Sequence, residues 1–139
     1  MMSERAYPDD GTNASRNEVN GAGEAPPRGG ELNAAITSAL VGIHHRYLGR
    51  GPTSASTWHH DNVIVTLMFG VLTPAEQSLA HSSHADAVAQ MRAAFQEVMA
   101  KDFGEAVERV TGRELVEFVS GNNVETGVVS EVFIMDANV

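Results

Sequence analysis

The chain of 139 residues contains no cysteine. That absence excludes disulfide bridges, cysteine-ligated zinc, iron–sulfur clusters and thiol catalysis. Basic residues are also scarce, because nine Lys and Arg stand against 18 Asp and Glu, for a formal net charge of −9. A nucleic-acid-binding protein needs a basic face to neutralise phosphates, and charge-driven docking onto an anionic membrane needs one too. The composition therefore argues against both kinds of partner.

The chain also lacks a long hydrophobic run. Its longest apolar stretch, residues 63–72, is interrupted by Thr66 and Gly70. A helix that crosses a bilayer needs ~20 apolar residues, and the first residues contain no apolar core of a signal peptide. We therefore expect a soluble, cytoplasmic protein without direct membrane insertion.

Large apolar side chains are scarce in residues 1–30, which contain no Ile, Leu, Phe or Trp. This stretch is rich in Gly and Pro, and it cannot bury enough apolar surface to offset the entropy of ordering. We predict a disordered acidic tail over residues 1–30. Residues 31–139 then form a single domain with one core.

Two segments show the hydrophobic spacing of an amphipathic helix, residues 31–48 and 85–110. Each is followed by a glycine, Gly49 or Gly112, in the position that favours a left-handed C-cap.

A third, short helix is predicted from Pro74 to about Ala80. Thr73 and Glu76 form the signature of a capping box before it. From the box alone we expect Thr73→Ala to destabilise the protein by about 1 kcal/mol and Glu76→Ala by less.

Four segments are predicted to be strands, namely residues 53–58, 63–69, 114–119 and 128–135. A helix with one apolar stripe must cover a sheet. We therefore predict an α+β fold, in which two β-hairpins form a four-stranded antiparallel sheet with helices on one face, in the order α-β-β-α-α-β-β.

The segment 63–69 is apolar on both of its faces. We expect its odd-numbered residues to lie beneath the helices. Ile64 and Met68 would then point to the opposite face, where a symmetric contact between two copies would cover them. We therefore predict a homodimer with Ile64 and Met68 at the interface.

Motifs for catalysis and metal binding are weak. His81 and His84 have a spacing found in helical metal sites, but the chain has neither an HExxH motif nor any cysteine. It also has no G-x-S-x-G nucleophile motif and no phosphate-binding P-loop. We therefore expect surface histidines, no metal or other cofactor and no catalytic residues, and the sequence leans away from an enzyme.

The nearest approach to a ligand site is the sequence GRGPTS over residues 49–54, with Arg113 at the equivalent place in the second half of the chain. An arginine with nearby hydroxyls and a histidine-rich turn suits an anion. The candidate residues for this site are Arg50, Thr53, Ser54, His59, His60 and Arg113.

Four motifs together carry a family resemblance: GRGP at residues 49–52, G-x-L-T-x-x-E-x-x-L at 70–79, Arg92, and TGR at 111–113. Their order and spacing resemble the MpsC-like family over about residues 32–135. The resemblance implies a soluble accessory protein near a cation- or bicarbonate-translocating membrane complex, and it implies no established reaction. Our leading interpretation is a non-enzymatic accessory or regulatory protein that forms a homodimer, with subunits of a membrane transport complex as possible partners. The alternatives are a small-ligand or anion-binding domain and, third, a metal-dependent enzyme.

Overall fold

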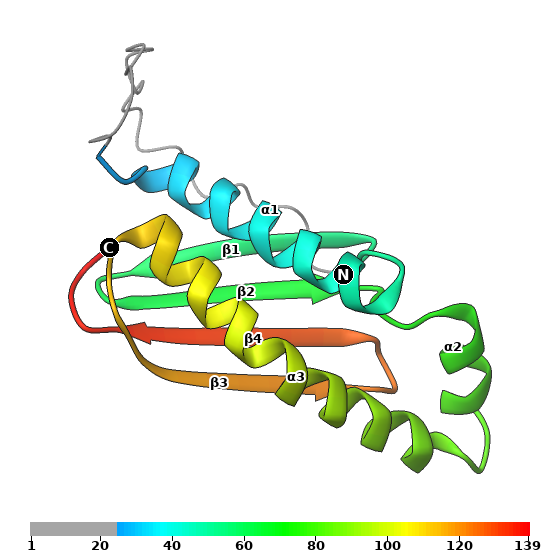
Figure 1. The fold of residues 1–139 in the computed structure, drawn as a ribbon. Helices are drawn as coiled ribbons and strands as arrows, with labels where there is room; N and C mark the ends of the chain where they lie inside the picture. The colour runs from blue at the N-terminus through cyan, green and yellow to red at the C-terminus, as the bar shows by residue number, and fades with distance from the viewer. Residues whose placement is uncertain (1–24) are drawn as a thin grey trace.

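The computed structural model describes residues 25–139, which form a four-stranded antiparallel sheet with two long helices on one side (Figure 1). Residues 1–24 of the predicted tail therefore lie outside the described residues, and Gly29 and Gly30 at its end belong to the first helix. The elements are α1 (Gly29–Leu48), β1 (Ser54–His60), β2 (Val63–Phe69), α2 (Pro74–Ala80), α3 (Ala85–Thr111), β3 (Leu115–Asn123) and β4 (Val128–Met135). The predicted fold class and element order are confirmed.

The strands lie in the order β1-β2-β4-β3, so the second strand of each hairpin is central. Helices α1 and α3 cross the same face of the sheet, with α1 toward β1 and α3 toward β3, and α2 lies beyond one end of the sheet (Figure 1). Within residues 25–139, none of the helices combines the length and hydropathy needed to cross a bilayer.

Local signals in the sequence fix the helix ends. Gly49 and Gly112 adopt left-handed conformations, with φ of 76° and 68°, and end α1 and α3 as predicted. The capping box also forms at α2. The Glu76 amide donates to Thr73 Oγ1 at 3.2 Å, and the Thr73 amide donates to Glu76 Oε1 at 2.9 Å.

Two strands are longer than their sequences suggest. β1 continues through His59 and His60, which were expected in the turn, so the β1–β2 connection shrinks to two residues. Asp61 there has a positive φ of 54°. β3 continues to Asn123 because it pairs with β4 along its whole length, a contact that local propensity does not report.

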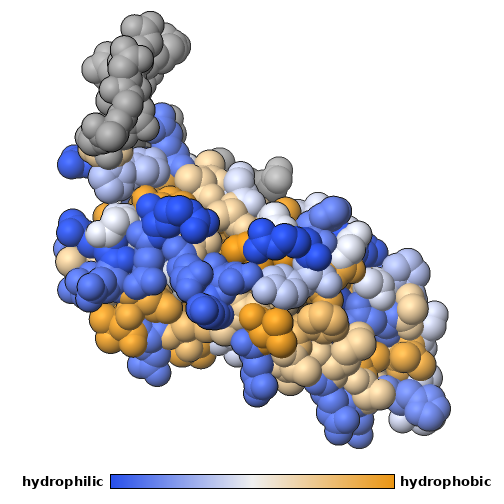
Figure 2. Space-filling model, viewed as in Figure 1, coloured by the Kyte–Doolittle hydropathy of each residue, from blue (hydrophilic) through white to orange (hydrophobic). Residues whose placement is uncertain are grey.

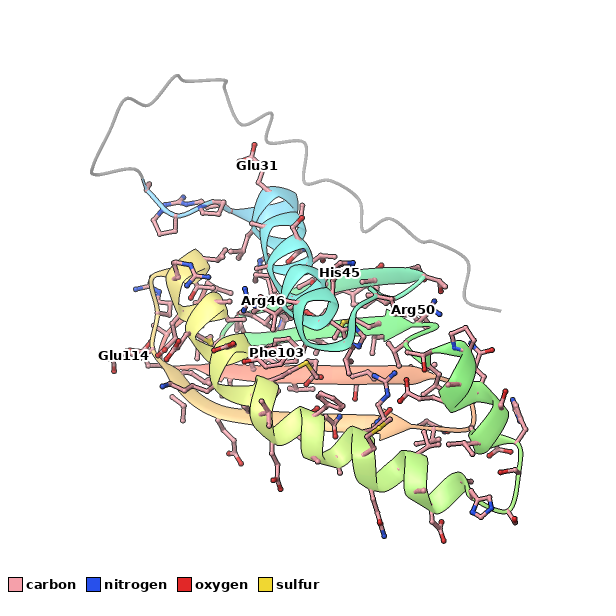
Figure 3. The ribbon with its side chains drawn as sticks, turned by 45° about the vertical axis from the view of Figure 1, so that its right-hand side comes forward. Glu31, His45, Arg46, Arg50, Phe103 and Glu114 are labelled. Atoms are coloured by element: carbon pink, nitrogen blue, oxygen red, sulfur yellow. The ribbon has the colours of Figure 1, made fainter. Side chains whose placement is uncertain are left out.

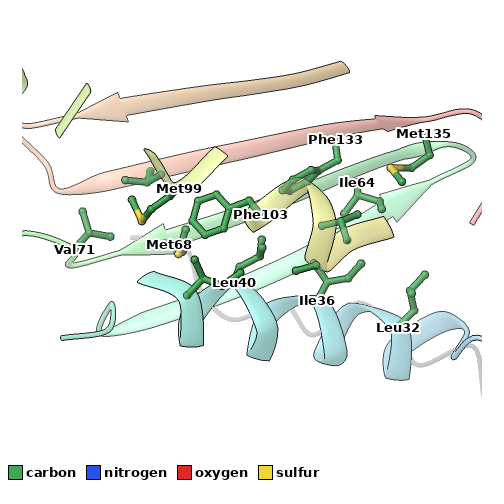
Figure 4. Close-up of a cluster of buried hydrophobic side chains, with 14 of the residues drawn as sticks. Leu32, Ile36, Leu40, Ile64, Met68, Val71, Met99, Phe103, Phe133 and Met135 are labelled. Atoms are coloured by element: carbon green, nitrogen blue, oxygen red, sulfur yellow. The ribbon is translucent and has the colours of Figure 1, made fainter. Parts of the chain in front are cut away.

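The prediction for the two faces of β2 is wrong. Ile64 and Met68 are fully buried, and they point toward α1 and α3 with the core residues of the helices (Figure 4). The odd-numbered residues of β2 lie on the opposite face and are half-buried. Because β2 is apolar on both faces, its alternation shows which residues share a face but not which face the helices cover. Ile64 and Met68 therefore cannot form a dimer interface in this fold.

The aromatic residues divide between the same two faces. Phe103 and Phe133 lie in the core. Trp58 and Phe69 are half-buried strand residues of the opposite face. We call this opposite side of the sheet, which neither α1 nor α3 covers, the open face.

Candidate functional site

The six candidate anion-binding residues do not converge on one site. Arg50 lies beside the end of β2 near Gly70, whereas Arg113 lies near the C-terminal residues, which bond to Asp61 at the start of β2. A strand of seven residues separates these places by about 20 Å. Figure 3 shows the same separation, with Arg50 and Glu114 at opposite ends of the sheet. Thr53 and Ser54 belong to the Arg50 end and His59 and His60 to the other.

Arg50 has a structural role. Its guanidinium donates to the carbonyl oxygens of Leu72 at 3.2 Å and Gly70 at 3.5 Å, and its Nε lies 3.5 Å from the Gly51 carbonyl. These contacts fasten the loop after α1 to the loop before α2. The donors that an anion would need are therefore directed at the backbone.

Arg113 is exposed, and its Nε donates to the Asn138 carbonyl at 3.0 Å. It lines a pocket of about 210 Å³ together with Arg28, Leu32 and Thr111. None of the other five candidate residues lines this pocket.

The histidines also remain apart. His59 Nδ1 lies 2.7 Å from Asn33 Oδ1, and His60 is exposed beside Asp61. Across residues 25–139, no group of three or more His, Cys, Asp or Glu side chains could hold a metal ion.

A buried ion pair joins α2 to α3. Arg92 is 2 % exposed, and its Nε and Nη2 donate to the two carboxylate oxygens of Glu76 at 2.7 and 2.6 Å. The same Nη2 donates to the Val71 carbonyl at 2.6 Å. A bidentate pair of this kind is directional as well as strong. It locks α2 and the loop before it against the long helix.

The surroundings of Glu76 keep its carboxylate charged. Burial alone would raise the pKa of Glu76, but the hydrogen bonds from Arg92 and from the Thr73 backbone outweigh it and lower the pKa below its usual value. The N-cap and the ion pair therefore share one carboxylate.

His44 of α1 completes this cluster. Its Nε2 lies 3.4 Å from Arg92 Nη1, and its Nδ1 lies 3.2 Å from the Arg50 carbonyl oxygen. Burial lowers the pKa of His44, and the nearby Arg92 charge lowers it further. A neutral ring that donates from Nδ1 and accepts at Nε2 satisfies both neighbours. We call His44, Thr73, Glu76 and Arg92 the junction cluster.

A second polar feature crosses the middle of the core. Four residues lie directly opposite one another across all four strands, all on the helix-facing side: Thr57, Thr66, Glu131 and Ser120. Thr37 of α1 extends the row at one end and Gln96 of α3 at the other. We call these six residues the polar row.

The hydroxyl protons on one side of the polar row have a fixed direction. Thr37 donates to the Asn33 carbonyl, so the 2.8 Å contact between Thr37 and Thr57 requires Thr57 to donate. The 2.8 Å contact between Thr57 and Thr66 then requires Thr66 to donate. Thr66 therefore has no proton left to donate to Glu131, its register partner on β4.

Glu131 lies at the centre of this row and is 1 % exposed. Burial raises its pKa to about 8, against a smaller opposing effect of the hydrogen bond from Ser120. Its Oε2 atom has no hydrogen-bond partner, and the same holds for Asn122 Oδ1 on β3. A buried carboxyl group without a charged partner is costly when ionised, so the surroundings favour its neutral form.

Sequence reasoning missed both features. Arg92 and Glu76 were visible as motif residues, but their contact joins positions 16 apart in the chain, across a loop. The polar row has a weak signal, since Thr66 and Glu131 interrupt the apolar strands β2 and β4 at matching registers. Reading that signal requires knowledge of the strand pairing.

A family model described as the Na+-translocating membrane potential-generating system (MpsC) matches residues 28–137. The chain belongs to this family, whose name links it to a sodium-translocating membrane system. No curated protein and no solved structure matches the chain. The residues that carried the resemblance lie at or beside the junction cluster, with the exception of the TGR motif at the other end of the sheet.

Proposed function

We propose that this protein is a cytoplasmic, non-enzymatic accessory protein of a cation-translocating membrane system and that it acts as a homodimer. The family's name supports the link to the membrane system. The observation that supports binding through a surface is the open face of the sheet, which has an apolar centre and which none of the described helices covers. Binding through surfaces fits this structure better than anion binding, because the candidate anion ligands lie at opposite ends of the sheet.

The open face has an apolar centre. Trp58, Val65, Val132 and Val119 lie opposite one another in one line across the four strands. Val119 is 51 % exposed. Other apolar residues flank this line on the two central strands, namely Val63, Leu67, Phe69 and Ile134.

A second copy of the chain is the partner that suits this face. The whole protein carries a formal charge of −9, so two copies repel each other except where they meet through a neutral surface. Among the described strand residues that register places on this face, Glu117 alone carries a formal charge. From the spacing of the strands and their rise per residue, the face measures about 19 by 23 Å. Two such faces have a flat area of about 900 Å², to which the protruding side chains add further surface. That area approaches the roughly 1,200 Å² at which stable interfaces begin.

Such a dimer leaves the helices outward. On α3, Met91 is 40 % and Val98 57 % exposed, and Leu79 of α2 is 42 % exposed. Figure 2 shows hydrophobic residues gathered over this part of the helix side. We propose that this helix surface, defined by Leu79, Met91 and Val98, contacts the membrane system.

Light scattering tests the dimer. The unmutated chain should give twice the monomer mass of 14.8 kDa at micromolar concentration, and Val65→Lys should give the monomer mass. Val98→Lys is the matched control, since it adds the same charge to the helix surface and should leave the dimer intact. A monomer mass for the unmutated chain would contradict the proposal.

The natural tryptophan gives a readout that needs no substitution. Trp58 is the only tryptophan of the chain and lies on the open face. Dilution of the unmutated protein should shift its fluorescence to the red as the interface separates. An emission that does not change with concentration, at concentrations where scattering reports a dimer, would mean that the copies meet elsewhere.

The link to the membrane system needs a separate experiment. A tagged chain in its native cells should co-purify with subunits of a cation-translocating complex after the membranes are solubilised. Val98→Lys should lose those subunits while it keeps the dimer. Recovery of the unmutated chain from the soluble fraction alone would contradict the accessory role.

A further inference from the structure

We propose that Glu131 is a buried proton-binding site that holds α3 and β3 together when it is protonated and loosens them when it is ionised. The proton site itself does not depend on the proposed function. Its consequence for partner binding does rest on that function, because α3 carries the helix surface proposed to contact the membrane system.

The buried and unpartnered Oε2 atom of Glu131 carries the inference. Thr66 donates its single hydroxyl proton to Thr57, so it has none left for Glu131, its register partner on β4. On the other side, Gln96 Nε2 donates to Ser120 Oγ at 2.8 Å, which leaves the Ser120 proton free for the Glu131 carboxyl. The Oε2 atom of that carboxyl has no hydrogen-bond partner. A proton on Oε2 removes the negative charge from this buried, unpartnered oxygen.

No compensating charge faces Glu131 from the elements packed around it. Its row neighbours on α1, β1, β2, β3 and α3 are Thr37, Thr57, Thr66, Ser120 and Gln96, all uncharged. Of the titratable groups on the helix-facing side, His59 bonds to Asn33, Arg92 is paired with Glu76, and His44 lies against Arg92. Ionisation thus places an uncompensated charge between the sheet and the helices.

The response to pH follows from the direction of the shift. The carboxyl group has a usual pKa of 4.5 and a folded value of about 8, so the folded protein binds the proton more tightly than the unfolded chain does. The contribution of Glu131 is fully present below pH 4.5, is lost as the pH rises from 4.5 to about 8, and is constant above that. Over that range, the folding equilibrium constant should fall by up to tenfold per pH unit.

Gln96, which ends the polar row, lies on α3 between Met91 and Val98. A loss of the Glu131 proton therefore acts on the same helix that presents the proposed partner surface. At alkaline pH, α3 should open more often than the β1–β2 hairpin, which lies farther from the polar row's Gln96 end.

Hydrogen exchange and chemical unfolding of the full chain test the proposal together. Between pH 6 and pH 9, after correction for intrinsic rates, amides of α3 and β3 should lose protection while those of β1 and β2 keep theirs. Glu131→Gln keeps the shape and supplies an N–H donor, so it should remove both this loss and the decrease in stability between pH 4.5 and 8. Glu117→Gln, which removes the same charge from the open face, should behave like the unmutated chain.

Each of the other results would overturn the proposal. Equal pH dependence in Glu131→Gln and the unmutated chain would exclude Glu131 as the proton site. If the variant does not fold, uniform loss of protection across all four strands of the unmutated chain would exclude a local effect. Unfolding measurements in sodium chloride and in choline chloride at equal ionic strength should agree. A stabilisation by Na+ at pH 9 would show instead that a metal ion, and not a proton, occupies the site.

Discussion

Glu76 and Glu131 are both buried, at 4 % and 1 % exposure, yet the structure treats them in opposite ways. Glu76 lies in the junction cluster, where Arg92 supplies two hydrogen bonds and a positive charge. Glu131 lies in the polar row among hydroxyl and amide groups and has one unpartnered oxygen. Burial raises the pKa of both groups, and the difference between them comes from the partner: the pKa of Glu76 ends below its usual value and that of Glu131 at about 8.

The two carboxyl groups therefore give stability of opposite pH dependence. The lowered pKa of Glu76 contributes stability above the usual pKa of 4.5, and this contribution is lost as the pH falls through the folded value. The raised pKa of Glu131 makes stability fall as the pH rises from 4.5 to about 8. The junction cluster at one end of the sheet thus stabilises the charged form of Glu76, whereas the polar row in the middle of the core favours the neutral form of Glu131.

The largest effect should come from removal of the Glu76 partner. Arg92→Met keeps the apolar stem but leaves the Glu76 carboxylate buried without its cation, which should cost about 3–5 kcal/mol in the free energy of unfolding. Chemical unfolding at pH 7 measures this. In effect, the substitution places Glu76 in the situation of Glu131, so the pKa of Glu76 should rise.

A double variant separates charge from packing. Glu76→Gln keeps a capping box, since Gln also serves at this position, and removes the charge. Arg92→Met with Glu76→Gln should therefore be more stable than Arg92→Met alone. A double variant that is less stable than the single one would mean that the cost lies in lost packing.

A smaller effect is expected at the cap that shares Glu76. Thr73→Ala removes the side-chain acceptor for the Glu76 amide and should cost about 1 kcal/mol. From the sequence, Glu76→Ala was expected to cost less than Thr73→Ala, but the structure reverses that order because Glu76 also neutralises the buried Arg92. Chemical unfolding of Thr73→Ala and of Glu76→Ala measures both losses in the free energy of unfolding and shows which is larger.

The sequence was sufficient for the elements because their signals are local. Gly49, Gly112 and the Thr73–Glu76 box mark helix ends through backbone conformation and hydrogen bonds within four residues. The same reasoning failed for the sheet faces. Both faces of β2 are apolar, so its alternation could not show that Ile64 and Met68 are core residues.

The candidate site could not be predicted for a related reason. The GRGP motif was interpreted as an anion site, but Arg50 donates to the carbonyls of Gly70 and Leu72. These contacts, like the alignment of Thr66 with Glu131, depend on which segments pair in the folded chain. Spacing along the sequence does not contain that information.

Carbon-13 NMR of the glutamate side-chain carboxyl carbons, followed from pH 3 to pH 10 in the unmutated chain, tests the comparison directly. It measures Glu76 and Glu131 in one sample. We predict that the Glu76 signal titrates below its usual value of 4.5 and that the Glu131 signal titrates near pH 8. Titration of Glu131 at or below 4.5 would contradict it, because the carboxyl group would then be charged in the core without a partner.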